Sequence, residues 1–259
     1  MADARLTLSQ EGHIALLTIR RPDKLNAFDM EMLAALDDAC REVSRDSEAR
    51  VAIITGDGKA FSAGGDIKAW GAMSSDQFGF DWVRYGHRVF GALAELRIPV
   101  IAALNGHALG GGLELAAAAD IRIAGPSVRL GLPETGLGMV PGWSGTQRLV
   151  QRFGGQIVRR MVLGGEVFTA AEGLALGLVD QVSEEGKVLD AAMEYASRVV
   201  TRGPAALQVT KLMIASATGE SPAASVETLA AMVVAKTGDL REGVAAFGEK
   251  RPAQFKGEW

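Results

Sequence analysis

Short apolar runs alternate with helical patterns along the first half of the chain. Residues 5–10 and 13–20 flank the dipeptide Glu11-Gly12, and this arrangement predicts a β-hairpin. A helix with an apolar face follows, and Asp29 can cap its first turn. Further strands are predicted at residues 50–55, 99–104, 120–124 and 128–131, and a further helix at about 75–95. The alternation of strands and helices favours a layered α/β fold.

The pattern changes after Gly154, where helical segments replace the short strands. Apolar stripes on these segments, such as Leu229, Met232 and Val233, are typical of a core or of a contact between subunits. The segments are separated by Gly and Pro and lie at residues 156–163, 169–176, 186–201, 204–217, 221–236 and 239–247. We therefore expect a helical C-terminal part that packs against neighbouring subunits.

The stretch richest in candidate chemistry lies between the apolar run 99–104 and an alanine-rich helix. Three consecutive glycines, Gly110 to Gly112, let a ligand approach the backbone, and the free N–H groups that open the next helix favour an anion. Glu114 follows within one turn, among apolar residues that would raise its pKa toward neutrality. A tight turn followed by an acid that complements the helix dipole would give the same pattern.

A second loop of small residues, Ser62 to Gly65, also leads from a strand region toward a helix. Two converging N–H donors would stabilise charge on the oxygen of a thioester or ester, whereas either loop alone can be a plain turn. Glu134 lies 20 residues after Glu114, with two predicted strands between them, so the chain can return to the same face. The two carboxylates could then activate a water and deliver its proton, although an acid just after Pro133 is also common at a helix start.

The composition is that of a globular protein with a sizeable core, since 48% of the 259 residues are hydrophobic and 22% are charged. The net charge of −4 gives no electrostatic reason to expect nucleic acid as a partner. The single cysteine, Cys40, cannot form an internal disulfide, and the three histidines lack the spacing of metal ligands. The first residues lack the pattern of a secretion signal and no apolar run is long enough to cross a bilayer, so we expect a cytoplasmic protein with no metal and no membrane partner.

Five motifs occur in a fixed order along the chain: Pro22-x-Lys24-x-Asn26-Ala27, Phe61 to Ile67, Gly106 to Glu114, Pro133-Glu134 through Gly145-Thr146-Gln147-Arg148, and Arg241-Glu242-Gly243 to Phe247-Gly248-Glu249-Lys250-Arg251. Together they resemble the enoyl-CoA hydratase (crotonase) family over essentially the full length. The resemblance implies an α/β fold, a crotonase-like spiral of ββα repeats with a helical C-terminal trimerisation region. It also implies a catalytic core at residues 1–200 and an oligomerisation region at 201–259, assembled as a homotrimer or as a hexamer made of two trimers.

The same resemblance implies a site. The N–H groups of Gly65 and Gly111 would form an oxyanion hole for the carbonyl of an acyl-CoA thioester, and Glu114 and Glu134 match the two catalytic glutamates of hydratases. The residues that would hold CoA or substrate are Lys24 and Ala27, then Ala63, Gly64, Asp66, Ile67 and Lys68 in the second loop, and finally Phe247 and Lys250, which would reach CoA from a neighbouring subunit.

The implied activity is the reversible syn addition of water to a trans-2-enoyl-CoA, giving a 3-hydroxyacyl-CoA in fatty-acid β-oxidation or related acyl-CoA catabolism. CoA arrives as part of the substrate, and no further cofactor is implied. A Δ3,Δ2-enoyl-CoA isomerase is the alternative within the fold, and a non-catalytic acyl-CoA-binding protein is the alternative without chemistry. Side chains expected to line or cover the acyl pocket, unless they belong to the core, are Trp70, Met73, Phe78, Phe80 and Trp82.

Overall fold

The structure of the protein is a computed structural model that describes residues 5–257. The chain divides into two compact units between Gln208 and Val209. The first unit contains both sheets, and the second is helical. No helix within the described residues is long and apolar enough to span a membrane.

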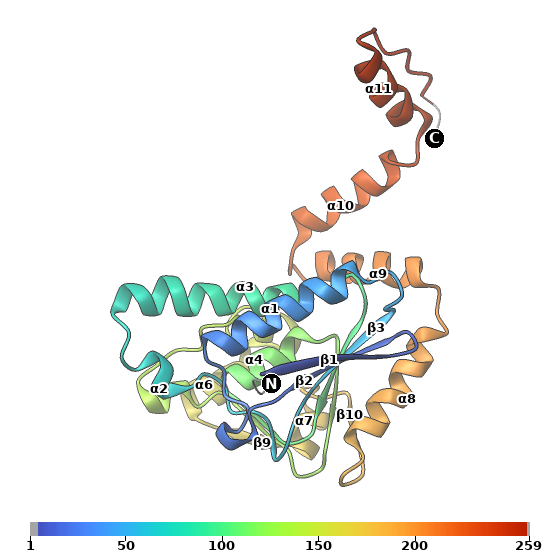
Figure 1. Cartoon of the computed structure of the whole chain (residues 1–259). Coiled ribbons are helices and arrows are strands. Elements are labelled where there is room, and N and C mark those ends of the chain that lie inside the picture. Colours follow the sequence, from blue (N-terminus) through green and yellow to red (C-terminus); the bar gives the residue numbers. More distant parts are fainter. Residues whose placement is uncertain (1–4, 258–259) are drawn as a thin grey trace. The chain divides into compact units, whose positions relative to one another are not determined.

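The larger sheet of the first unit has six strands in the order β1-β2-β3-β5-β7-β10 (Figure 1). Its strands are β1 (Leu6–Glu11), β2 (Ile14–Ile19), β3 (Val51–Gly56), β5 (Val100–Leu104), β7 (Ile121–Ala124) and β10 (Gln181–Val182). β1 and β2 are antiparallel, with Leu6 opposite Ile19 and Glu11 opposite Ile14, which confirms the predicted hairpin. Every other neighbouring pair in this sheet is parallel.

The smaller sheet has four strands in the order β4-β6-β8-β9. They are β4 (Ala60–Ser62), β6 (His107–Leu109), β8 (Arg129–Gly131) and β9 (Val167–Thr169). Consecutive strands of the chain therefore separate: β3, β5 and β7 enter the larger sheet, and β4, β6 and β8 enter the smaller one. Because β7 and β8 belong to different sheets, the two strands predicted between Glu114 and Glu134 do not pair with each other.

Helices cover both faces of the larger sheet. Side chains such as Ile53 and Ile101 pack with α8 (Val188–Val200), whereas their neighbours Ile54 and Ala102 belong to the main core on the other face. This alternation follows from the two-residue period of a strand. The other helical elements of this unit are η1 (Pro22–Lys24, 3₁₀), α1 (Met30–Arg45), α2 (Ile67–Trp70), η2 (Gln77–Val83, π), α3 (Arg84–Ala94), α4 (Gly111–Ala118), η3 (Glu134–Leu137, 3₁₀), α5 (Arg148–Phe153), α6 (Gly155–Gly164) and α7 (Ala170–Ala175).

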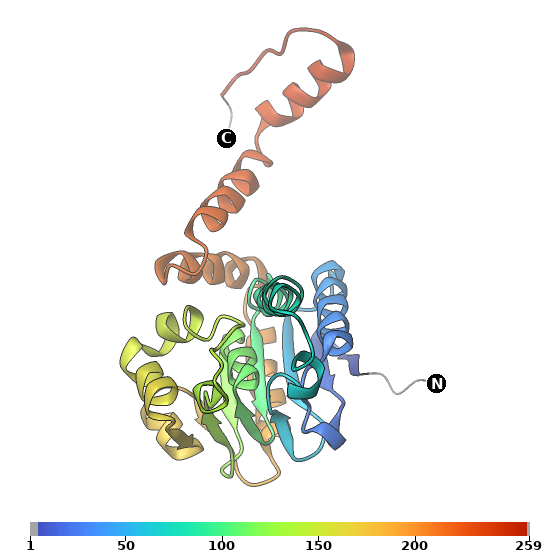
Figure 2. The same cartoon turned by 90° about the vertical axis from the view of Figure 1, so that its left-hand side faces the viewer.

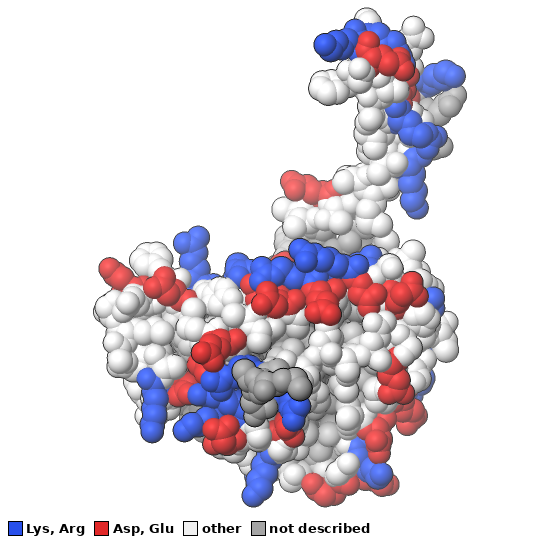
Figure 3. All heavy atoms as spheres, in the orientation of Figure 1, with Lys and Arg blue, Asp and Glu red and all other residues white. Residues whose placement is uncertain are grey.

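The two helices α1 and α3 run side by side (Figure 2). Asp29 caps α1 as expected, because its side chain accepts a hydrogen bond from the N–H of Met32 at 2.9 Å. A row of basic side chains lies beside a row of acidic ones on the exposed surface of this helix pair (Figure 3), where Arg88 of α3 and Arg41 of α1 both pair with Asp37. The helix predicted at 75–95 is confirmed only in its second half, since its first half is the π-helix η2.

The second unit consists of the end of α9 (Pro204–Ala217) followed by α10 (Pro222–Val234) and α11 (Gly238–Glu249). These helices confirm the helical pattern expected for the C-terminal part. Much of the apolar surface in this unit is exposed, at Met213, Ile214, Val226, Met232, Val233, Val234, Leu240, Val244, Phe247 and Phe255. Within this chain the stripe on α10 is therefore a surface and not a core.

Candidate active site

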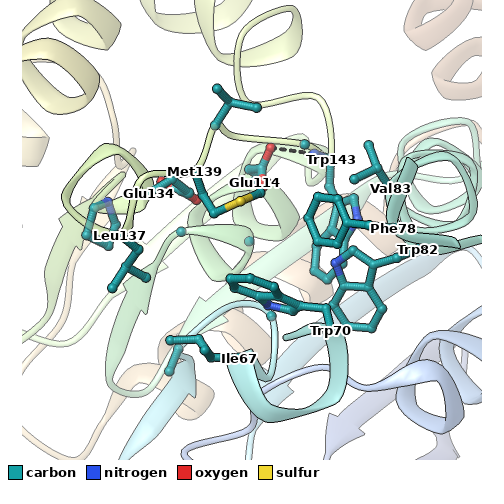
Figure 4. A pocket seen from close by; sticks show the side chains of 17 residues that line it. Ile67, Trp70, Phe78, Trp82, Val83, Glu114, Glu134, Leu137, Met139 and Trp143 are labelled. Atoms are coloured by element: carbon teal, nitrogen blue, oxygen red, sulfur yellow. Dashed lines mark hydrogen bonds between the residues drawn. The ribbon is translucent and has the colours of Figure 1, made fainter. Parts of the chain in front are cut away.

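A pocket lies where the smaller sheet ends and α4 begins (Figure 4). Three of the segments that form it directly follow neighbouring parallel strands: Ala63 and Gly65 follow β4, Gly110 and Gly111 follow β6, and Glu134 follows β8. The carboxyl ends of parallel neighbours lie at one edge of a sheet, which explains why these distant segments meet. The other lining residues are Ile67, Trp70, Phe78, Trp82, Val83, Glu114, Pro133, Leu137, Met139, Val140, Gly142 and Trp143.

The turn into α4 requires glycine. Gly110 has φ 54° and ψ −128°, a conformation that L side chains rarely adopt, and its N–H donates to the carbonyl of Gly131 at 2.9 Å. A Cβ on Gly110 would lie 2.8 Å from Oε1 of Glu134, so the absent side chain leaves room for that acid. Gly111 is the first residue of α4, and its N–H therefore has no acceptor within the helix.

The second glycine loop lies directly beside this turn. A Cβ on Gly64 would come within 2.8 Å of the backbone nitrogen of Gly111, so the two loops touch. The loop is held by Phe28, whose N–H donates to the carbonyl of Gly64 at 2.8 Å and whose carbonyl accepts from Asp66 at 2.7 Å. The structure thus brings the two predicted oxyanion glycines, Gly65 and Gly111, to one pocket.

Glu114 lies in the first turn of α4 with only 2% of its surface exposed. Its Oε1 accepts hydrogen bonds from the N–H groups of Trp143 at 2.7 Å and Gly145 at 2.6 Å. Burial, and then the negative charge of Glu134, raise the pKa of Glu114 to about 8, against the opposing effect of the two N–H donors. This agrees with the direction expected from the apolar sequence around it.

Glu134 opens the 3₁₀ turn η3 after Pro133. Burial raises the pKa of its carboxyl group, and its Oε2 is buried with no hydrogen-bond partner among the described residues. Because the charge of Glu134 also raises the pKa of Glu114, the two carboxyl groups are coupled and share protons as a pair. Near neutral pH such a pair offers one group that can accept a proton and one that can donate it.

An aromatic wall faces the two acids across the pocket (Figure 4). Trp70 and Phe78 pack edge to face with ring centroids 5.4 Å apart, and Trp82 and Trp143 lie 5.1 Å apart. The expectation that Trp70, Phe78 and Trp82 line the pocket is thus met. The other two aromatic or large side chains expected there, Met73 and Phe80, instead line a separate surface groove with Met30 and Tyr85.

The structure does not bring all the predicted CoA-binding residues to this pocket. Ala63 and Ile67 line it, whereas Gly64 is buried behind it. Asp66 pairs with Arg21 at 2.8 Å and caps α2, which gives it a structural role. Of the remaining five, Ala27 is buried next to the Asp66 loop, Lys24 and Lys68 are exposed on the first unit, and Phe247 and Lys250 belong to the second unit.

Sequence reasoning missed the side chains that follow Glu134. Leu137, Met139 and Val140 come from the turn after it, and Trp143 supplies both an indole wall and an N–H donor to Glu114. The available signal was a large aromatic residue within the segment Pro141-Gly142-Trp143-Ser144-Gly145, otherwise made of small or turn-forming residues. Among the residues that the structure describes, no group of three or more His, Cys, Asp or Glu side chains could hold a metal ion.

The comparisons with known proteins agree with this geometry. The family model for enoyl-CoA hydratase/isomerase matches residues 9–258. The chain belongs to the enoyl-CoA hydratase/isomerase family. It is 38% identical to a short-chain-enoyl-CoA hydratase of Clostridium acetobutylicum, over 94% of each chain. It is 37% identical to a crotonyl-CoA hydratase of Syntrophomonas wolfei, over 98% of this chain and 99% of the relative.

Solved structures of this family share the fold. The structure of an enoyl-CoA hydratase from Bacillus anthracis matches with a TM-score of 0.81 and 33% sequence identity, over 98% of this chain and all of that one. The α/β, crotonase-like fold of ββα repeats predicted from the sequence is confirmed, and the structure shows that these repeats place their strands in two sheets.

Proposed function

We propose that this family member is an enoyl-CoA hydratase, which adds water reversibly to a trans-2-enoyl-CoA and forms a 3-hydroxyacyl-CoA. The single observation that carries the proposal is the pairing of Glu114 and Glu134 in one pocket with the glycine loops of Gly65 and Gly111. Relatives named as hydratases support the same reaction. An isomerase needs one base to move a proton between carbons, whereas hydration uses an acid and a base together.

In the proposed reaction the ionised carboxylate of the pair takes a proton from water as the water oxygen bonds to C3. The π electrons of the C2–C3 double bond move toward the thioester and leave negative charge on its oxygen. The N–H groups of Gly65 and Gly111 stabilise this oxygen, and one such donor is worth about 2.7–4 kcal/mol in a well-studied enzyme. The neutral carboxyl group then gives its proton to C2, which completes the addition of one water.

The oxygens available for proton exchange are the two Oε2 atoms. Oε1 of Glu114 already accepts two N–H groups, so a proton on this residue belongs on Oε2. Oε2 of Glu134 has no hydrogen-bond partner in the part of the chain that the structure describes. Because both acids lie on one side of the pocket (Figure 4), oxygen and hydrogen would reach the same face of the double bond, which gives syn addition.

The substrate brings CoA with it, and the proposal needs no other cofactor. We further propose that Lys24, Ala27 and the backbone from Ala63 to Lys68 hold CoA, and that Phe247 and Lys250 approach it from a neighbouring subunit. The exposed apolar surface of the second unit supports assembly into a homotrimer or a hexamer, since Phe247 is 88% exposed and Val244 is 66% exposed.

The deciding experiment is turnover of crotonyl-CoA in ¹⁸O-labelled water. A hydratase consumes the absorbance of the conjugated thioester and forms 3-hydroxybutyryl-CoA that carries one ¹⁸O atom at C3. Conversion of a 3-enoyl-CoA to the 2-enoyl isomer without label in the product would instead identify an isomerase. CoA binding without turnover of either substrate would identify a non-catalytic acyl-CoA-binding protein.

A further inference from the structure

Ser144 occupies a strained position between the two residues whose N–H groups hold Glu114. Its φ is 82°, in the left-handed region that favours glycine, and only 3% of its surface is exposed. The N–H groups of Trp143 and Gly145 on either side both donate to Oε1 of Glu114. A non-glycine residue persists in such a conformation only where its surroundings hold it there.

Two consecutive residues of α3 contact this segment and keep it in its conformation. Nδ1 of His87 lies 3.1 Å from Oγ of Ser144, within hydrogen-bond distance. The preceding residue, Gly86, has no side chain where the indole of Trp143 packs, and a Cβ at this position would overlap the indole nitrogen. Phe90, one turn further along α3, packs against the same indole with ring centroids 5.0 Å apart.

Trp143 also touches both glycine loops. A Cβ on Gly111 would lie 2.8 Å from the indole ring, and a Cβ on Gly65 would lie 3.6 Å from it. The indole of Trp143 therefore packs against the two predicted oxyanion donors, and the backbone N–H of Trp143 holds Glu114. Any displacement of Trp143 would move the acid relative to the thioester carbonyl.

We propose that Gly86 and His87 of α3 are positioning residues, which set Glu114 against the glycine loops by holding the segment Trp143-Ser144-Gly145. Gly86 leaves room for the indole of Trp143, and His87 fixes the hydroxyl group of the strained Ser144. Neither residue lines the pocket, so both act through the segment and not on the substrate. This inference rests on the proposed function for its effect on catalysis, but the hold on the segment is a property of the fold.

The charges around the segment are compatible with a neutral His87. Burial, followed by the positive charge of Arg148, lowers the pKa of His87, so the imidazole is uncharged at neutral pH and Nδ1 can pair with a hydroxyl group. The groups that face Glu114 are Glu134, which raises its pKa, and Arg148 with the two N–H donors, which lower it. Moving the N–H groups of Trp143 and Gly145 away from Oε1 would therefore raise the pKa of Glu114.

Four variants test the proposal with crotonyl-CoA as substrate: His87→Ala, Ser144→Gly, Gly86→Ala and the control Gly91→Ala. Gly91 lies on the same helix, and a Cβ there would meet nothing within 4 Å. We expect kcat to fall on the order of 10- to 100-fold in the first three variants, the effect of a small misplacement of a catalytic group, while KM changes little. We also expect the alkaline limb of their pH–rate profile to move to higher pH, because weaker donation to Oε1 raises the pKa of Glu114, which is protonated at neutral pH. Gly91→Ala should match the natural chain in both measurements.

Hydrogen exchange of the Trp143 and Gly145 amides gives a readout that does not depend on turnover. Exchange should be faster in His87→Ala and Ser144→Gly than in Gly91→Ala. Ser144→Gly is informative even if Gly86→Ala fails to fold, since glycine relieves the strained φ and removes only the hydroxyl contact. Natural rates, an unshifted pH profile and unchanged exchange in His87→Ala and Ser144→Gly would overturn the inference. If the natural chain hydrates no enoyl-CoA, the proposed function fails, and the exchange measurement still decides whether α3 holds the segment.

Discussion

The backbone N–H of Gly145 donates a 2.6 Å hydrogen bond to Oε1 of Glu114, a residue 31 positions earlier in the chain. With the parallel donation from Trp143 at 2.7 Å, this bond fixes one oxygen of a buried carboxyl group and leaves the other for chemistry. Such an acid is preorganised, because its orientation does not depend on bound substrate.

Replacing either acid by its amide should abolish most hydration while preserving the fold. In Glu114→Gln the side-chain oxygen can still accept both N–H groups, but the group no longer exchanges a proton at neutral pH. We expect kcat for crotonyl-CoA to fall by about 10²- to 10⁴-fold in Glu114→Gln and in Glu134→Gln. The double variant should lose little more than either single one, since the two acids act as a unit. The exposed Glu185→Gln serves as the control, and equal rates in all variants would remove the mechanism.

The stability of the protein should decrease with rising pH on account of Glu114. Its pKa in the folded state, about 8, lies above the ordinary value of 4.5, so the folded chain binds the proton more tightly than the unfolded chain. The free energy of unfolding contributed by this group is therefore complete below about 4.5 and is lost as the pH rises to about 8. Burial of Glu134 acts in the same direction. The free energy of unfolding, measured with urea across this pH window, should fall less steeply with rising pH in Glu114→Gln than in the natural chain. The same pH dependence in both would contradict the assignment.

Gly110→Ala should impair catalysis beyond the cost of backbone strain. Gly110 has φ 54°, and the new Cβ would lie 2.8 Å from Oε1 of Glu134. The matched control is Gly12→Ala, where φ is 56° but a Cβ would meet nothing within 4 Å. A side chain at positive φ is strained, so both variants should be less stable in urea. Only Gly110→Ala should lose crotonyl-CoA turnover, and retention of full activity there would show that Glu134 does not need its observed position.

Asn26 should prove to be a structural anchor for the Gly64-Gly65 loop. It is fully buried with φ 56°, its Nδ2 donates to the carbonyls of Asp57 at 2.8 Å and Ala60 at 2.7 Å, and its own carbonyl accepts from Ser62. Asn26→Ala removes both donations from Nδ2 and leaves the bond from Ser62 intact; the carbonyl of Ala60 keeps a 3.3 Å bond from Asn105, so the unpaired carbonyl of Asp57 accounts for a cost of about 1–3 kcal/mol, to which the strain of a left-handed alanine is added. Asn26→Gly avoids the strain, so its urea midpoint should fall between those of the natural chain and Asn26→Ala. Equal midpoints for the two variants would show that the backbone conformation contributes little.

Charge on the apolar surface of α11 should weaken assembly. Val244 is 66% exposed in a single chain, and burial between subunits would place an aspartate there in an apolar contact without a partner. Sedimentation velocity should therefore show smaller species for Val244→Asp than for the conservative control Val244→Ile. A natural chain that sediments as a monomer would refute the proposed trimer or hexamer.

The sequence predicted the parts of the site that depend on local patterns. Gly110 to Glu114 could be recognised because a strand, a glycine turn and a helix start follow one another within a short stretch. Trp143 was missed because its role depends on contacts with α3 and α4, which no local pattern encodes. Phe80 was misplaced for another reason: the first half of the helix predicted at 75–95 is a π-helix, whose wider turns change the direction of each side chain.

The separation of ββα units between two sheets also bears on how this molecule could acquire a new substrate. The glycines and Glu134 follow strand ends and Glu114 lies in α4, whereas Trp70 and Phe78 come from residues 67–83, a connection outside either sheet. Under the proposed function, substitutions at Trp70 and Phe78 reshape the acyl cavity, whereas Trp82 of the same connection packs 5.1 Å from Trp143, whose N–H holds Glu114. Acyl preference on this fold can therefore change through residues 67–81 while Trp82 is kept, and random libraries confined to those residues are the place to search for altered selectivity.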